Sequence, residues 1–213
     1  MQSTLRKPTR VYAKGAARRE ALLDAASTLL DSHELDQLSL KDIAECASIP
    51  VGSAYHFFAN AQDLFVALAQ RFMSSLFTVV SEPYSGTSLK SWQNLFDAAT
   101  DRAAKLYEEN PGYRQLIIGG KSPPDIKLAD RKNDERVGQL MIDVIKRHFH
   151  FDESLYSNDV FFFATEIVDL MFSLSVIRHG VITTEMLEEA KKAGKSYALL
   201  YIPEVLLPVS DNS

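Results

Sequence analysis

The chain has 213 residues, a hydrophobic content of 46% and a formal net charge of −5. This length allows one or two domains with a sizeable core, and the composition is ordinary for a soluble globular protein. The acidic balance excludes a wholly basic nucleic-acid binder. The single cysteine, Cys46, excludes an intramolecular disulfide and fits a reducing compartment. We expect Cys46 to be a small buried residue.

The first 19 residues are strongly basic. They contain six Lys or Arg residues and no acidic residue, so the rest of the chain carries −11, which is the total of −5 less the +6 of this segment. A basic segment on an acidic body indicates a local contact with DNA, and a solvated tail without a partner is the alternative. The segment lacks the apolar core of a signal peptide. No apolar run approaches the ~18–20 residues of a membrane span, so we expect a cytoplasmic protein.

Residues 1–14 show no periodicity and are predicted to be a flexible arm. A first helix is predicted over residues 16–32, where leucine and alanine recur at the spacing of one helical face. This helix is expected to brace the segment that follows it.

Residues 39–58 predict two short helices joined by a tight turn. Ser39 can cap the first helix, with Asp42 as its capping-box partner. Ser48 lies in the bend, and Pro50 suits the first turn of the second helix because its missing N–H costs nothing there. Two helices joined by a turn of this length are typical of a DNA-reading helix-turn-helix.

The order of small, apolar and aromatic residues here resembles the N-terminal signature of the TetR family of transcriptional repressors. The residues that carry the resemblance are Ile43, Ala44, Ala47, Gly52, Tyr55, Phe58 and Leu64. The resemblance covers residues 19–68, and Ser48 stands where the signature has its turn glycine. It implies a three-helix, homeodomain-like DNA-binding domain, followed by a larger helical domain for ligand binding and dimerisation.

The rest of the chain continues the helical period. A helix capped by Asn60 ends before Pro83, and a loop over residues 81–88 follows it. Further helices are expected over residues 89–109, 113–118, 125–149, 158–179 and 184–206. No strand alternation persists, so the predicted fold class is all-α, with domains at residues 1–60 and 61–213.

Two motifs in the second half are rejected as chemical sites. Residues 120–122 resemble the end of a phosphate-binding loop, but the earlier glycine and the preceding strand are missing. His148 and His150 are two residues apart, so they face different sides of a helix. The charged stretch over residues 127–136 is expected to be a solvated half of its helix. The sequence therefore predicts no metal, no cofactor and no enzymatic activity.

Candidate DNA contacts gather at the start of the second short helix. Val51 can meet a thymine methyl group and Ser53 can hydrogen-bond a base or a phosphate, while Gly52 lets the backbone approach closely. Arm residues are expected in the minor groove. For Tyr55, core packing is an equal alternative. The full predicted set is Arg6, Lys7, Arg10, Ser39, Lys41, Pro50, Val51, Gly52, Ser53, Tyr55 and His56.

The C-terminal two-thirds of the chain is rich in aromatic residues. The resemblance implies that some of them line an inducer cavity, and that the last two long helices pair with those of a second subunit. The predicted pocket residues, which suit a largely apolar or aromatic effector, are Trp92, Phe96, Tyr113, Phe163 and Met171. A dense core without a cavity is the alternative. Residues 160–163 are apolar all round, which a dimer interface or a ligand would explain.

These observations predict a homodimeric transcriptional repressor that binds a pseudo-palindromic operator of double-stranded DNA. Its half-sites are expected about one helical turn, ~34–36 Å, apart. A small-molecule effector is expected to release it. Two alternatives are a helical adaptor that binds no DNA and an all-α enzyme with an apolar pocket. An activator would make the same DNA contacts as a repressor.

Overall fold

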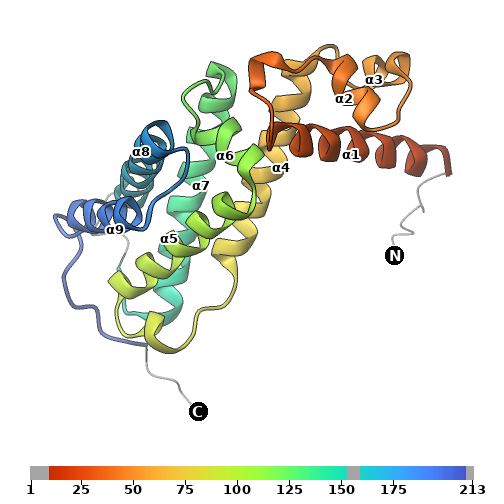
Figure 1. Cartoon of the computed structure of the whole chain (residues 1–213). Helices are drawn as coiled ribbons and strands as arrows, with labels where there is room; N and C mark the ends of the chain where they lie inside the picture. The colour runs from red at the N-terminus through yellow and green to blue at the C-terminus, as the bar shows by residue number, and fades with distance from the viewer. Residues whose placement is uncertain (1–9, 153–158, 210–213) are drawn as a thin grey trace, which may run out of the picture. The chain divides into compact units, whose positions relative to one another are not determined.

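The computed structural model describes residues 10–152 and 159–209, with side chains from residue 14 onward. In this part of the chain the regular structure is helical, with one isolated β-bridge and no strand, which confirms the all-α prediction. The helices, drawn in Figure 1, are α1 (Arg10–Leu30), α2 (Leu40–Cys46), α3 (Val51–Phe57), α4 (Ala61–Ser81), α5 (Trp92–Glu109), α6 (Pro111–Ile118), α7 (Pro124–His148), α8 (Val160–His179) and α9 (Thr184–Ala198). Two short 3₁₀ helices, Leu35–Gln37 and Gly86–Leu89, lie between them.

The chain forms two compact units, residues 1–68 and 69–213. The division falls inside α4, so the first two turns of this helix belong to one unit and the rest to the other. Asn60 caps α4 as predicted, since its Oδ1 accepts a hydrogen bond from the Asp63 backbone N–H at 2.9 Å. The predicted domains at residues 1–60 and 61–213 stay a prediction.

The first unit packs α2 and α3 against α1. Its core consists of residues that are fully buried, namely Leu22, Ala26, Ile43, Ala44, Ala54 and Leu64. Helix α1 begins at Arg10, whereas the sequence predicts an arm as far as residue 14. The reason is the high helix propensity of Ala13, Ala16 and Ala17, which extends the helix across Gly15.

The capping box at the start of α2 is confirmed. The Ser39 Oγ accepts a hydrogen bond from the Asp42 N–H at 3.3 Å, and the Asp42 Oδ2 accepts one from the Ser39 N–H at 2.9 Å. The Ser39 hydroxyl and then the Ser39 N–H, which both donate to the Asp42 carboxylate, lower the pKa of this carboxyl. Cys46, predicted to be buried, is exposed at the end of α2. Two residues along a helix lie about 200° apart, so Cys46 faces away from the buried Ala44.

The turn between α2 and α3 is a Schellman motif. The Ile49 N–H donates to the Ala44 carbonyl at 2.9 Å, and the Ser48 N–H donates to the Glu45 carbonyl at 3.0 Å. Ser48 sits at the left-handed position with φ 54°, which a residue with a Cβ adopts at a cost.

Replacing Ser48 by glycine is expected to stabilise the first unit. The substitution removes the left-handed strain but adds entropy to the unfolded chain, so the net gain should be about 0.5–1 kcal/mol. Thermal unfolding followed by circular dichroism measures it. Ser53→Gly, inside α3, is the control and should lower stability, because there glycine only weakens a helix. A loss of stability in Ser48→Gly would contradict the interpretation that the backbone of Ser48 is strained.

The second unit is built around α8, which packs against α7 on one side and α9 on the other. Fully buried aromatic side chains dominate its core and include Phe72, Trp92, Tyr107, Phe161 and Phe172. Gly138 of α7 lies close to the backbone of α8, where a Cβ would meet the Phe162 nitrogen at 2.7 Å. Gly180, with φ 75°, ends α8.

Helix α9 ends at Ala198, eight residues before the predicted end. Pro203 disfavours the helical conformation of the residue before it, and the chain turns over residues 199–202. The following segment packs on α5, where the Trp92 Nε1–H donates to the Pro203 carbonyl at 2.9 Å. A bridge then pairs Phe149 with Pro208.

Two helices meet the length and composition criteria for a membrane span, α4 and α8, so the expectation of no such run is wrong. Half of the apolar window of α4 is buried inside the protein, as in the core helix of a soluble protein. Only a third of the window in α8 is buried. Helix α8 therefore presents apolar surface that the described residues do not cover.

Candidate nucleic-acid interface and ligand cavity

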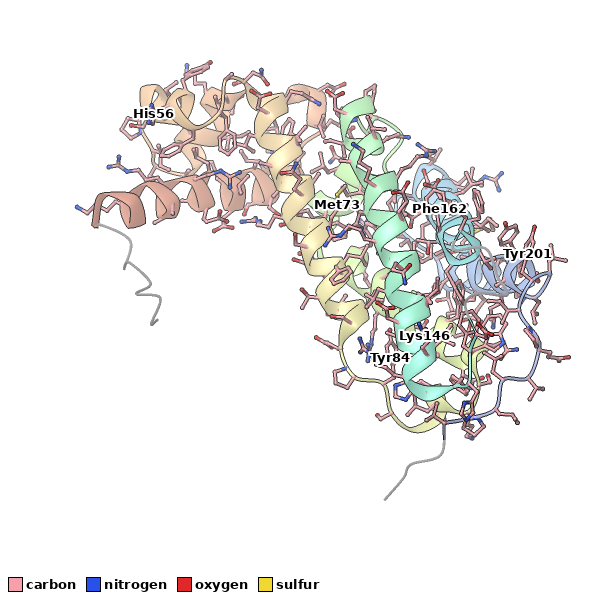
Figure 2. The ribbon with its side chains drawn as sticks, turned by 180° about the vertical axis from the view of Figure 1, so that it is seen from behind. His56, Met73, Tyr84, Lys146, Phe162 and Tyr201 are labelled. Carbon is pink, nitrogen blue, oxygen red and sulfur yellow. The ribbon has the colours of Figure 1, made fainter. Side chains whose placement is uncertain are left out.

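Helix α3 buries one face and exposes the other. Ala54 is fully buried and the following Phe58 is 5% exposed, so these residues hold α3 on the first unit. Tyr55 is 55% exposed, and Gly52 and His56 are exposed as well (Figure 2 labels His56). For Tyr55 the structure favours a surface role over the core packing that the sequence leaves open.

The N-terminal end of α3 is open to solvent. The prediction that Pro50 belongs to the first turn of this helix is wrong, because Pro50 is the residue before the helix. Its carbonyl accepts hydrogen bonds from the N–H groups of Ser53 at 2.8 Å and Ala54 at 3.2 Å. A Cβ placed on Gly52 would meet nothing within 4 Å. Val51 and Ser53 are half-buried. Backbone N–H groups at such a helix end favour an anion, and the open space lets one approach.

Lys41 and Ser39 lie at the start of α2 and are both exposed. The Lys41 ammonium is 3.8 Å from the Glu45 carboxylate, an exposed pair of the kind that contributes little stability. The ammonium can therefore exchange this partner for a phosphate. The Ser39 hydroxyl donates to the Asp42 carboxylate at 2.5 Å, so its first role is to cap α2.

The predicted arm contacts fall largely beyond the described residues. Arg6 and Lys7 lie outside them, and Arg10 begins α1 with a side chain that is also outside them. Two exposed cations on α1, Lys14 and Arg18, extend the basic surface and were not among the predicted contacts. Lys14 falls in the segment predicted to be an arm, whereas Arg18 lies in the predicted first helix, and both are part of α1.

Two small cavities occur in the second unit. An apolar one of about 40 Å³ has walls from α4, α5, α7 and α8, with Leu76, Val137 and Val168 among its lining residues. A more polar one of about 130 Å³ lies among α6, α7 and α8. Asp134 and Asp169 line both, so the two cavities adjoin.

One of the five predicted pocket residues, Phe96, lines the apolar cavity. Trp92 is fully buried against Phe161, with ring centroids 6.2 Å apart. Tyr113 is buried, and its hydroxyl accepts a hydrogen bond from the Arg71 Nε at 3.0 Å. Phe163 is 44% exposed and Met171 is half-buried. Their assignment to an effector pocket stays a prediction.

The polar cavity contains carboxyl groups with raised pKa values. Burial and then the charge of Glu166 raise the pKa of Asp130 to about 7. Burial and then the charge of Asp169 raise the pKa of Asp134 to about 10, and burial with the charge of Asp130 raises that of Asp169. The prediction that residues 127–136 form a solvated half of their helix is wrong, because Asn133 and Asp134 are only 3% and 2% exposed.

Large hydrophobic side chains are exposed on α8 and in the segments that follow α8 and α9. Those that are at least 41% exposed there are Phe163, Leu170, Ile177, Val181, Leu199, Leu200, Tyr201, Val205, Leu207 and Val209. We call this set of residues the α8–α9 surface; Figure 2 labels Tyr201, which lies in the turn after α9. Exposed apolar side chains that adjoin one another mark an interaction site.

Family comparisons match both units of the chain. Residues 22–68 match the family described as "Bacterial regulatory proteins, tetR family", and residues 90–200 match "Tetracyclin repressor-like, C-terminal domain". A curated relative, the HTH-type transcriptional repressor KstR2 of Mycobacterium tuberculosis, is 26% identical over 141 residues, which cover 65% of this chain and 70% of the relative.

Solved structures agree with this assignment. A TetR-family transcriptional regulator from Streptomyces coelicolor superposes with a TM-score of 0.70 and 27% identity, covering 88% of this chain and 99% of its own. A TetR regulator from Rhodococcus sp. RHA1 shows the same fold, with a TM-score of 0.64, 18% identity and coverage of 90% and 100%. The relatives are transcriptional regulators and not enzymes. Because the C-terminal family match alone spans more than half of the residues, the chain belongs to the TetR family of DNA-binding transcriptional regulators.

Proposed function

We propose that this regulator is a homodimeric repressor that binds a pseudo-palindromic operator through α3 and leaves the DNA when a small molecule binds its second unit. The observation that carries the proposal is the exposed face of α3 in a helix-turn-helix that matches the family. The curated Mycobacterium relative is named as a repressor, which supports repression over activation. The protein is expected to act in the cytoplasm, as TetR-family regulators do.

The proposed DNA contacts follow from the exposure of each side chain. Val51 and Gly52 open the recognition helix, so they approach base edges in the major groove, and Ser53 reaches a base or a phosphate. Tyr55 and His56 point outward on the same helix and suit backbone contacts. The remaining proposed contacts, to backbone or minor groove, are Arg6, Lys7, Arg10, Ser39, Lys41 and Pro50.

The α8–α9 surface is the proposed dimer interface. Its exposed residues include Leu170 and Ile177, which lie seven residues apart and therefore on one face of α8. A two-fold pairing of this face with its copy would bury both at once. Such a dimer would present two α3 helices, which explains the pseudo-palindromic operator.

The proposed effector site is the pair of adjoining cavities with the aromatic residues around it. An effector that is largely apolar suits the lining of Leu76, Phe96, Val137 and Met141. A cavity of about 40 Å³ is too small for most effectors, so the helices must move when one binds. Binding would release DNA only if the effector favours one arrangement of the recognition helices over the other, with a coupling of typically 1–3 kcal/mol.

A gel-shift experiment tests the proposal directly. The full chain is titrated onto DNA flanking its own gene, with an unrelated sequence of equal length as control. We expect a specific complex with two chains per site. Binding no tighter than to the control DNA would favour the adaptor alternative. A reporter gene behind the bound site then separates repression from activation by the direction of its response.

Lys41→Ala tests the phosphate contact at the start of α2. The plot of log affinity against log salt should lose about one unit of slope for each contact removed. The matched control is Lys105→Ala, because Lys105 also forms an exposed ion pair four residues along its helix, with Glu109 at 3.7 Å, but lies on α5. An unchanged slope in Lys41→Ala would remove this residue from the interface.

A further inference from the structure

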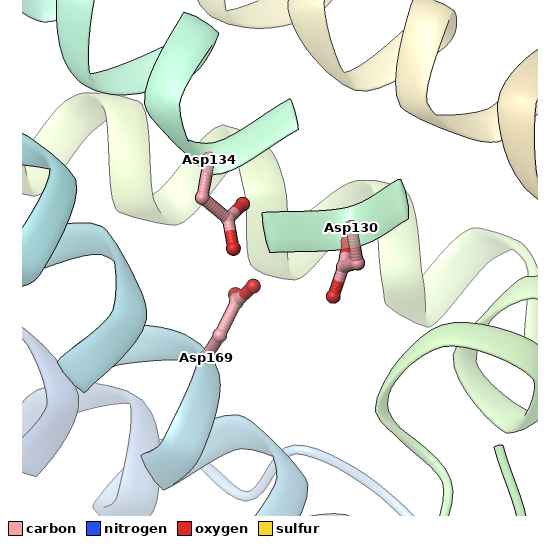
Figure 3. A group of neighbouring side chains, drawn as sticks. All are labelled: Asp130, Asp134 and Asp169. Atoms are coloured by element: carbon pink, nitrogen blue, oxygen red, sulfur yellow. The ribbon is translucent and has the colours of Figure 1, made fainter. Parts of the chain in front are cut away.

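Three carboxylates from two helices meet in the polar cavity of the second unit. Asp130 and Asp134 lie one turn apart on α7, and Asp169 faces them from α8 (Figure 3). One oxygen of each lies within 4.8 Å of the other two. We call these residues the aspartate cluster. The cluster takes no part in the proposed DNA contacts, so an inference about it does not depend on them.

The carboxyl groups of the cluster have no direct cationic partner among the described residues. No ion pair within 4.0 Å joins Asp130, Asp134 or Asp169 to a Lys, Arg or His there. Two basic residues of α7, Lys127 and Arg131, also line this cavity, and Arg131 pairs with Glu166 at 3.4 Å. Ionised carboxylates this close in a poorly solvated site repel one another strongly, so the site takes up either protons or a cation that displaces them.

Two buried oxygen atoms beside the cluster lack a hydrogen-bond partner among the described residues. Asp134 is 2% exposed, and its Oδ1 is unpaired. The Tyr107 hydroxyl, from α5, is also unpaired, and its side chain is fully buried. Burial raises the pKa of this hydroxyl, and the charges of Asp169, Asp130 and Asp134 raise it further. The Tyr107 ring packs against Phe172, one turn after Asp169 on α8, with ring centroids 6.2 Å apart, which places Tyr107 near the cluster. Unpaired buried oxygens cost stability unless something binds them.

We propose that Asp130, Asp134 and Asp169 bind one divalent cation of the hard, oxygen-preferring class. Donors on opposite sides of Ca²⁺ lie about 4.6–5.2 Å apart, so the cluster admits this ion with little movement, while Mg²⁺ or Mn²⁺ needs a small contraction. The absence of His and Cys from the cluster disfavours softer metals. The cavity of about 130 Å³ leaves room for water ligands as well.

A cation here would join α7 to α8. Two of its ligands belong to α7 and one to α8, so binding resists separation of the two helices. The apolar cavity shares Asp134 and Asp169 with the cluster. The ion would therefore also set the charge that an effector meets at that end of the apolar cavity.

The test uses the full-length chain after treatment with a chelator. Ca²⁺, Mn²⁺ and Mg²⁺ are titrated separately by calorimetry, and thermal unfolding is recorded with and without each ion. We expect saturable binding of one ion per chain, with a dissociation constant of ~1 mM or below for at least one of them, and a raised melting temperature. Folded protein that neither takes up nor is stabilised by any of these ions would overturn the proposal.

Variants assign the ion to the cluster. Asp134→Asn and Asp169→Asn keep the side-chain shape and should weaken binding at least tenfold. Asp143→Asn removes the same charge from an exposed site on α7 and should leave binding unchanged. Full affinity in Asp134→Asn would overturn the site.

A measurement on the unmodified protein covers the case in which a variant does not fold. Paramagnetic Mn²⁺ should broaden the ring resonances of Tyr107, which lies near the cluster, whereas diamagnetic Ca²⁺ should leave them sharp. Tyr107 resonances that stay sharp at a saturating concentration of Mn²⁺ would contradict the site. All of these measurements are made without DNA, so their failure leaves the repressor proposal intact.

Discussion

Replacing Gly138 by alanine is expected to lower the free energy of unfolding by about 2–3 kcal/mol. The added Cβ would lie 2.7 Å from the Phe162 nitrogen, 3.0 Å from its Cα and 3.1 Å from the Phe161 carbonyl carbon. These are backbone atoms of α8 and cannot rotate away, so α7 and α8 must move apart. Alanine gains about 1 kcal/mol of helix propensity over glycine, which offsets only part of this cost.

Thermal unfolding should show the Gly138→Ala loss as a fall in melting temperature of roughly 5–10 °C. Gly52→Ala is the matched control, since a Cβ at that position meets nothing within 4 Å and alanine favours the helix. It should melt at the same temperature as the unmodified chain or slightly above it. If Gly138→Ala keeps the original melting temperature, α7 and α8 do not approach as closely as described.

Gly52→Glu is expected to reduce operator affinity by more than 100-fold while leaving the fold intact. The side chain would extend into open space at the first turn of α3, where a negative charge favours the helix. The same charge would face the DNA phosphates or the acceptor-rich base edges, and like charges brought together in an interface cost several kcal/mol. Affinity is measured at fixed salt, with circular dichroism to confirm folding.

Gly52→Lys separates charge from bulk at this position. Lysine has a similar length, so a purely steric block would abolish binding in both variants. If charge dominates, Gly52→Lys keeps affinity for DNA in general and gains salt dependence. Operator affinity within threefold of the original in Gly52→Glu would show that the start of α3 does not face the duplex.

The helices were largely predictable from sequence because hydrophobic periodicity and capping residues are local signals. Ser39 and Asn60 cap their helices as predicted. The errors lie at ends that local signals do not fix. Helix α1 begins at Arg10, inside the segment expected to be an arm, and the chain leaves α9 after Ala198 to pack on Trp92. That last contact joins residues 111 positions apart, which no local pattern contains.

The candidate sites divide along the same line. The outward face of α3 could be predicted because it follows from the helical period around the buried Ala54. The aspartate cluster could not, because a charged stretch normally lies in solvent and Asp169 joins it only through the packing of α8 on α7. The effector cavity depends on how aromatic side chains pack, which composition alone does not determine.

The exposure of Cys46 gives this regulator a ready-made labelling position. It is the sole thiol in the chain, and it is the last residue of α2, five residues before the recognition helix α3 begins at Val51. A nitroxide attached there needs no mutagenesis, and a dimer would carry two of them. Pulsed electron paramagnetic resonance between the two labels would then measure the distance between the two DNA-binding units. A change in this distance on adding a candidate compound would identify that compound as an inducer.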